Sequence, residues 1–265
     1  MKKISILLVI ASLMVLVSCG NQGGKKASTK AISTEEAYAQ ADFKIKMDSL
    51  IHSLSMLQSV PLGKDIKDGK ITLTAKEKKV KPNYLLPLSK AKDLVTTSQK
   101  WSGMAMYDID LQVAKFYDMP TQDLEQLLAK LALDVNSPAT TALFKDYDFK
   151  TYFDALYKEH MDNGTLDIYW TAVTAALVES LYITTNNVDK FMGAFTDESA
   201  AEISYRFILV RDAIQTVISF HPEMAELNKV MEPLYVINAV TVKDLRTQLI
   251  ELKGSISVVR DYLLK

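Results

Sequence analysis

Apolar residues recur at every third or fourth position along most of this chain, and this spacing constrains the fold more than any other feature. One example is the series Phe43, Met47, Leu50, Leu54 and Leu57. Side chains with this spacing share one face of an α-helix, which has about 3.6 residues per turn. No segment shows the sustained period-two alternation of a half-buried strand. The pattern predicts an all-α fold, an antiparallel multi-helix array of about 9–10 helices.

Capping residues and helix breakers predict where the helices begin and end. Ser33 and Glu36 form a capping-box pattern at the start of the first helix, which should end before Pro61. Thr121 is expected to cap a later helix. Helix 166–185 is mostly apolar or small, so we expect it at the centre of the array. The other expected helices cover about 87–98, 98–118, 121–133, 137–146, 147–162, 187–195, 199–220, 222–231 and 241–264, with a short turn near 74–79.

The first 18 residues have the organisation of a secretory signal. Lys2 and Lys3 precede an apolar run, Ile4–Val17, and Ser18 and Cys19 follow it. The run is shorter than the about 20 apolar residues that a comfortable membrane span needs. The single cysteine among 265 residues excludes an internal disulfide.

The sequence Leu16-Val17-Ser18-Cys19 resembles the lipobox of bacterial lipoproteins. The resemblance implies that residues 1–18 are removed and that Cys19 becomes the acylated N-terminus. In such lipoproteins an Asp after the cysteine often retains the protein in the inner membrane, so Gly20 implies the outer membrane. Residues 21–26 lack the Lys-then-acidic pattern of some surface-export signals, which favours the periplasmic face over the cell surface. The alternative is an ordinary secretory signal with a coincidental cysteine.

Composition and length set the domain organisation. Hydrophobic residues make up 48% of the chain and charged residues 24%, as in globular proteins with a core. We predict a signal peptide over 1–18, a flexible polar tether over 19–33 and a single all-helical domain over 34–265. Removal of Lys2 and Lys3 from the 31 basic residues leaves 29 against 32 acidic ones. The chain therefore lacks the strong basic excess of nucleic-acid-binding proteins, and we expect no nucleic-acid partner.

Two carboxylates occupy apolar faces of expected core helices. At 100° per residue, Asp110 projects from the apolar face of helix 98–118. Glu179 lies on the apolar side of helix 166–185. Burial of either carboxylate without a partner would cost several kcal/mol. Each should therefore have a basic partner or a set of hydrogen bonds.

Helix 199–220 supplies two candidate partners, because Arg206 and Arg211 flank its apolar face. We predict that Asp110 or Glu179 pairs with one of these arginines. One interpretation is a structural salt bridge that fixes helix register. A second is the polar floor of a ligand cleft between helices. A third is a pair of acids for general acid–base chemistry.

No catalytic, cofactor or metal-binding motif is present, so we expect neither a cofactor nor an enzyme. None of the three histidines, His52, His160 and His221, has a Glu three residues earlier, and Asp48 and His52 are expected to form a surface pair. The lysine-rich segment 61–82 is either a solvated loop or a contact for anionic lipid headgroups.

Three segments, Ser98–Tyr117, the following helix to Leu133, and Val173–Thr184, resemble uncharacterised all-helical envelope lipoproteins of Gram-negative gut-type bacteria. The resemblance implies a helical fold and an envelope location, but no activity. The matching positions are Gly103, Tyr107, Asp110, Leu111, Glu179, Leu181 and Tyr182.

These features together predict a lipid-anchored, periplasm-facing protein of the outer membrane. Its expected contacts are the membrane, through the lipid on Cys19, and an envelope protein partner, and its expected role is partner binding or structural support. The sequence assigns no oligomeric state. The alternative is a lipid-tethered small-ligand-binding protein with an interhelical cleft near Asp110 and Glu179.

Overall fold

The computed structural model describes residues 33–57, 71–138, 140 and 149–265, and every element in these ranges is helical, which confirms the all-α prediction. The α-helices are α1 (Thr34–Met56), α3 (Ala75–Lys79), α4 (Thr97–Phe116), α5 (Gln122–Val135), α7 (Phe149–Asp162), α8 (Leu166–Asn186), α9 (Val188–Phe191), α10 (Asp197–Val217), α11 (Met224–Met231), α12 (Val242–Glu251) and α13 (Lys253–Tyr262). The 3₁₀-helices are η1 (Leu88–Asp93), η2 (Met192–Ala194) and η3 (Glu232–Leu234). The predicted signal peptide, the lipidation site Cys19 and most of the predicted helix 137–146 lie outside the described residues.

The chain divides into two units, residues 1–39 and 40–265, and the second holds the core. The prediction of one domain over 34–265 stays a prediction. The predicted capping box at the start of α1 is confirmed. The Ser33 N–H donates to Glu36 Oε2 at 2.9 Å, and the Glu36 N–H donates to Ser33 Oγ at 3.1 Å.

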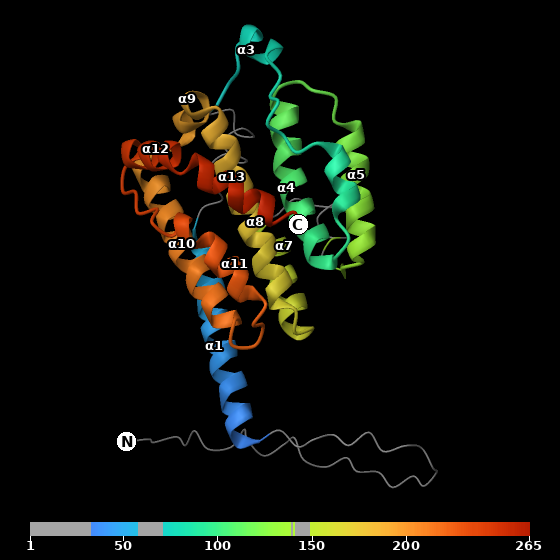
Figure 1. Ribbon diagram of the computed structural model, residues 1–265, viewed down its shortest axis with the longest axis vertical. Coiled ribbons are helices and arrows are strands. Elements are labelled where there is room, and N and C mark those ends of the chain that lie inside the picture. Colours follow the sequence, from blue (N-terminus) through green and yellow to red (C-terminus); the bar gives the residue numbers. More distant parts are fainter. Residues whose placement is uncertain (1–32, 58–70, 139, 141–148) are drawn as a thin grey trace, which may run out of the picture. The chain divides into compact units, whose positions relative to one another are not determined.

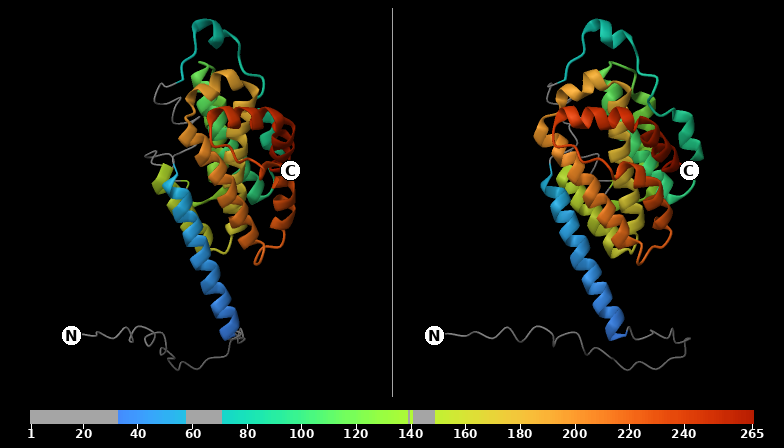
Figure 2. Two further views of the ribbon diagram at one scale, coloured as in Figure 1. Left: turned by 90° about the vertical axis from the view of Figure 1, so that its left-hand side faces the viewer. Right: turned by 60° about the vertical axis from the view of Figure 1, so that its left-hand side comes forward.

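Helix α8 is the central helix of the unit formed by residues 40–265, as the sequence predicts. It packs against α4, α7, α10 and α13 (Figures 1 and 2). Its small residues allow this close packing, since Ala172 and Ala175 are only 6% and 0% exposed. Trp170 and Val178 are fully buried. A helix with apolar residues on almost every side can be stable only when it is surrounded in this way.

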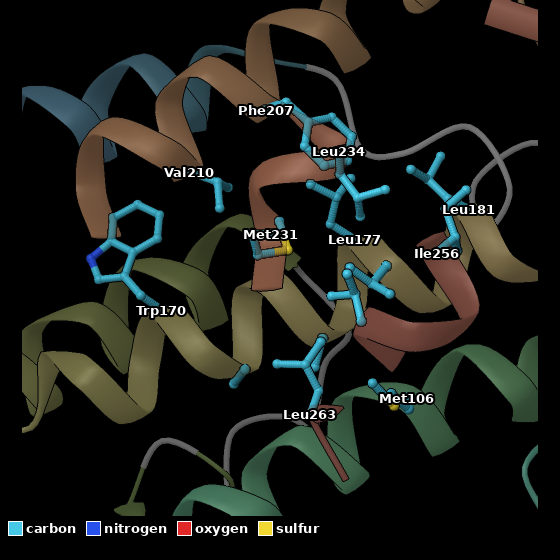
Figure 3. Close-up of a cluster of buried hydrophobic side chains, with 14 of the residues drawn as sticks. Met106, Trp170, Leu177, Leu181, Phe207, Val210, Met231, Leu234, Ile256 and Leu263 are labelled. Carbon is cyan, nitrogen blue, oxygen red and sulfur yellow. The ribbon is translucent and has the colours of Figure 1, made fainter. Parts of the chain in front are cut away.

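Side chains from five helices meet in the core beside α8 (Figure 3). Met106 comes from α4, Trp170 from α8, Phe207 from α10, Met231 from α11 and Ile256 from α13. Each of these side chains is at most 1% exposed. Burial of a side chain of this size contributes about 1.5–3 kcal/mol. Helices far apart in the sequence are therefore held together by shared apolar contacts.

The prediction of one continuous helix over 241–264 is wrong. Helix α12 ends at Glu251 and α13 begins at Lys253, because Leu252 has φ −88° and ψ 1° and so leaves the helical conformation. Gly254 lies in the first turn of α13, and glycine weakens a helix by about 0.5–1 kcal/mol. The break lets α13 pack against α8 independently of α12.

The predicted side-chain cap at Thr121 is also wrong, although α5 does begin directly after it. The Thr121 hydroxyl donates to Glu125 Oε1 at 3.3 Å and accepts no backbone N–H. The predicted turn near 74–79 is confirmed as α3, which Thr74 and Glu77 cap reciprocally. None of the helices within the described ranges combines the length and apolar character required to cross a bilayer.

Candidate functional site

Three charged side chains, Asp110, Glu179 and Arg260, form a polar cluster inside the core. Asp110 comes from α4, Glu179 from α8 and Arg260 from α13. Their exposed fractions are 1%, 0% and 7%. Helix α8 packs against both α4 and α13, so the cluster lies where three segments distant in sequence meet. We call these three residues the core polar cluster.

Arg260 and Glu179 form a two-point ion pair. Arg260 Nε donates to Glu179 Oε2 at 2.5 Å, and Arg260 Nη2 donates to Glu179 Oε1 at 2.8 Å. This fork matches the planar guanidinium to the planar carboxylate and fixes the orientation of both. The guanidinium also lies 4.0 Å from the centre of the Tyr182 ring, one turn along α8. Burial raises the pKa of Glu179, and the hydrogen bonds from Arg260 oppose that rise.

Asp110 completes the cluster as the protonated member. Its Oδ2 accepts the Leu86 N–H at 2.7 Å, and its buried Oδ1 has no hydrogen-bond partner among the described residues. Burial, and then the nearby negative charge of Glu179, raise the pKa of Asp110 well above its usual range. Two buried carboxyl groups beside each other repel when both are ionised, so the group with the more strongly raised pKa keeps its proton. We therefore assign the proton to Asp110, which leaves the cluster with one positive and one negative charge.

The prediction that Arg206 or Arg211 pairs with the buried acids is wrong. Arg211 instead pairs with its neighbour Asp212, at 3.0 Å, near the surface. Arg206 is buried, and its Nη2 has no hydrogen-bond partner among the described residues. Burial lowers the pKa of Arg206, and the charge of Glu202 opposes this. Helix α10 packs on α8 through its apolar stripe, so the arginines that flank this stripe do not reach Glu179.

Arg260 is the functional residue that sequence reasoning missed. The signal that could have identified it is its spacing, since Ile256 lies four residues before it and Leu263 three residues after it. Those two side chains are 0% and 3% exposed. An arginine at this spacing projects from the apolar face of its helix, just as Asp110 does.

The geometry of the core polar cluster suits a structural role. Arg260 bonds to Glu179, Asp110 Oδ2 bonds to the backbone, and the negligible exposure of the three side chains leaves no position for a substrate among them. The neighbouring phenols also stay neutral, because burial raises the pKa of Tyr84 and of Tyr107. The Tyr107 hydroxyl donates to the Pro87 carbonyl at 2.9 Å. The cluster thus links α4, α8 and α13 to the segment that carries Leu86.

A cavity of 310 Å³ lies elsewhere, between α1 and α7. Its lining includes the predicted surface pair, Asp48 and His52, but neither of the core carboxylates. Among the described residues, the side chains that bond to Asp48 are those of Tyr157 and Lys44 and not that of His52. Asp48 Oδ1 accepts from Tyr157 Oη at 2.8 Å, and its Oδ2 pairs with Lys44 Nζ at 3.1 Å. The complete lining consists of Asp48, Ile51, His52, Ser55, Met56, Asp154 and Tyr157.

Metal-ligating side chains come together at a third place, the N-terminal end of α8. Asp167, His221 and Glu223 each offer one ligand atom, and these atoms lie within 4.8 Å of one another. Sequence reasoning missed this group because Asp167 is far from the other two in the chain and the three match no metal-binding motif. Pro222 separates His221 from Glu223 and lies in the turn between α10 and α11.

No family model, curated protein or solved structure matches this chain. The resemblance to helical envelope lipoproteins therefore stays a prediction. So do the lipidation of Cys19, the envelope location and the contact of the lysine-rich segment with lipid headgroups. Part of that segment is held by the protein itself, because Lys78 pairs with Asp118 at 2.7 Å and Lys81 donates to the Tyr117 carbonyl.

Proposed function

We propose that this chain is a lipid-anchored protein of the bacterial outer membrane, with a periplasm-facing helical body that binds a partner or supports the envelope. The observation that carries the proposal is the position of the only cysteine, Cys19, directly after a short apolar run that follows Lys2 and Lys3. A tether of about 14 residues after Cys19 would span roughly 20 Å as a random coil. The helical body would then work close to its membrane.

The core geometry supports a binding or structural role over catalysis. The carboxylates singled out by the sequence are engaged with Arg260 and with the backbone of Leu86. General acid–base chemistry needs a carboxyl group within hydrogen-bond reach of a substrate. At 1% and 0% exposure, Asp110 and Glu179 offer no such access.

The test of the anchor is membrane fractionation of two variants expressed with the native N-terminus. Cys19→Ala removes the acylation site, and Ser18→Ala is the matched control because it keeps a small residue before the cysteine. We expect the wild type and Ser18→Ala to incorporate an alkyne-labelled fatty acid and sediment with membranes. Cys19→Ala should do neither. If Cys19→Ala remains fully membrane-bound and labelled, the lipid anchor is refuted.

The partner-binding part of the proposal has a separate readout. Crosslinking in intact cells, followed by purification of the tagged chain, should recover the same envelope protein in fixed proportion from the wild type and from Ser18→Ala. Recovery should fall in Cys19→Ala, since the tethered body is no longer concentrated at the membrane. Equal recovery with all three forms would show that the anchor has no part in the interaction.

A second candidate function is small-ligand binding, and the cavity between α1 and α7 favours it. Its 310 Å³ is at the lower end of the range for ligand pockets, about 300–1,000 Å³. Asp154→Leu, which removes a lining carboxylate, should change ligand recovery in native mass spectrometry of the purified chain. An identical spectrum, with no bound small molecule in either form, would eliminate this candidate.

A further inference from the structure

The imidazole of His221 lies between two carboxylates at one end of α8. Its Nδ1 is 3.4 Å from Asp167 Oδ1 and 3.1 Å from Glu223 Oε1. Asp167 is in the first turn of α8, and Glu223 is the residue before α11. Three potential ligand atoms from two segments distant in sequence therefore converge on one point. We call these residues the His221 triad.

The His221 triad has an excess of negative charge. Among the described residues, neither Asp167 nor Glu223 forms an ion pair with a lysine or arginine, and His221 is the basic partner of both. The positive end of α8 offsets about half a charge near Asp167. The triad therefore stays negative whether or not His221 is protonated. The side chains of His221 and Asp167 are only 20% and 22% exposed, so solvent screens this charge incompletely.

We propose that the His221 triad binds a divalent transition-metal ion, with Zn²⁺ as the preferred ion. His221 Nδ1 and one oxygen from each of Asp167 and Glu223 would be the ligands. Zinc bonds of about 2.0–2.2 Å in a tetrahedral arrangement separate ligand atoms by about 3.3–3.6 Å. The observed separations of 3.1 and 3.4 Å from Nδ1 are close to this spacing, and all three ligand atoms lie within 4.8 Å of one another.

The donor set also selects the class of metal. Sites for Mg²⁺ and Ca²⁺ are built from oxygen ligands alone, whereas an imidazole nitrogen favours Zn²⁺ and other transition metals. The ligands must be unprotonated to bind the ion, so affinity should fall at acidic pH. Three protein ligands leave a fourth tetrahedral position for water or for a donor from another molecule. The proposal goes beyond the envelope role above and does not depend on it.

The metal site would strengthen the connection between α8 and the turn before α11, which already meet through the contact of His221 with Asp167. Phe220, next to His221, contacts Phe43 of α1 with ring centres 4.4 Å apart. A metal ion on the triad would fix the turn that carries Phe220 to the N-terminal end of α8. Binding should therefore increase thermal stability, because an ion that binds only the folded state stabilises it by mass action.

The test is calorimetric titration of Zn²⁺ into the full chain, purified in detergent and stripped with EDTA. We expect one saturable site in the wild type. His221→Ala removes a direct ligand and should weaken Zn²⁺ binding at least about 100-fold. Loss of a residue that only hydrogen-bonds to a ligand already lowers metal affinity by about 10–100-fold. His52→Ala is the matched control, since His52 is an exposed histidine of α1, and it should bind like the wild type. With free Zn²⁺ at about 100 times Kd, the wild-type Tm should rise by roughly 5–10 °C.

A second variant keeps the test decisive if His221→Ala does not fold. Glu223→Gln changes a side chain that is 63% exposed, so its fold should be intact by circular dichroism, and its affinity should fall about tenfold or more. The absence of a saturable site in the wild type would overturn the proposal. Wild-type affinity in a folded His221→Ala or Glu223→Gln chain would overturn it too, because Zn²⁺ would then bind elsewhere.

Discussion

Replacement of Arg260 by methionine should destabilise the fold severely, because it would leave Glu179 buried without its cation. Methionine keeps most of the length and the apolar contacts of the arginine side chain, so the change isolates the charge. In the wild type, the side chains of Arg260 and Glu179 are 8% and 0% exposed, and two hydrogen bonds join them. Water cannot replace the lost bonds at such a site without opening the core.

The magnitude follows from the geometry. Removal of one partner from a buried ion pair costs about 3–5 kcal/mol, because the remaining charge is uncompensated. Loss of the guanidinium above Tyr182 adds about 0.5–2 kcal/mol. Glu179 can take up a proton when its cation is lost, and this neutralisation limits the total loss of stability. We therefore expect a loss of about 3–5 kcal/mol and, for a domain of this size, a fall in Tm of roughly 6–20 °C.

Urea denaturation followed by circular dichroism at 222 nm measures this loss. Arg211→Met is the matched control, since Arg211 and Asp212 are 38% and 44% exposed and should contribute about 0–1 kcal/mol. A double-mutant cycle with Glu179→Gln isolates the pair. Because a glutamine side chain carries no charge, Arg260→Met should cost at least about 2 kcal/mol less in the Glu179→Gln background.

A free energy of unfolding for Arg260→Met within about 1 kcal/mol of that for Arg211→Met would refute this prediction. That result would mean that the buried pair is no stronger than a surface pair. A cycle without coupling would also contradict it, since the cost would then come from packing alone. Agreement in the urea m-values of the variants would show that the comparison concerns stability and not a change in the unfolded state.

Three further substitutions test the core. Asp110→Asn should flatten the stability profile above about pH 4, because burial raises the folded-state pKa of Asp110. The stabilising contribution of Asp110 is complete below its unfolded pKa of about 3.9 and is lost, by up to about 1.4 kcal/mol per pH unit, as pH rises. In thermal unfolding, Gly103→Ala should destabilise by about 1–3 kcal/mol, because its Cβ would overlap Leu94 Cδ1. Gly254→Ala should stabilise by about 0.5–1 kcal/mol, since its added Cβ would meet no neighbouring atom within 4 Å. A Gly103→Ala chain more stable than the Gly254→Ala chain would contradict the packing described for these two glycines.

Local pattern was sufficient to predict much of the fold. The expected helix 98–118 corresponds to α4, Thr97–Phe116, because its apolar spacing and the following Pro120 act within a few residues of one another. The central position of α8 follows from its composition for the same reason. Helical projection also identified Asp110 and Glu179 as unusual, since a charge on an apolar face is visible without knowledge of what packs against it.

The partners of those acids depend on tertiary contacts that pattern does not contain. The choice of Arg260 over Arg206 requires α13 to pack against α8, and that orientation depends on the break at Leu252. The apolar spacing on both sides of Leu252 is continuous, so local pattern does not reveal the break. The bond from the Leu86 N–H to Asp110 comes from an irregular segment, where no periodicity exists to be read.

The two polar groups differ in charge balance, and this difference separates a structural role from a binding role. In the core polar cluster, the proton on Asp110 leaves one cation for one anion, and all three side chains are buried. Such a group needs nothing from outside and can only fix how α4, α8 and α13 align. The His221 triad has two carboxylates, one imidazole and a partly exposed edge. An unbalanced and accessible group can gain stability from an added cation, so the search for a ligand of this protein should begin at His221 and not at Glu179.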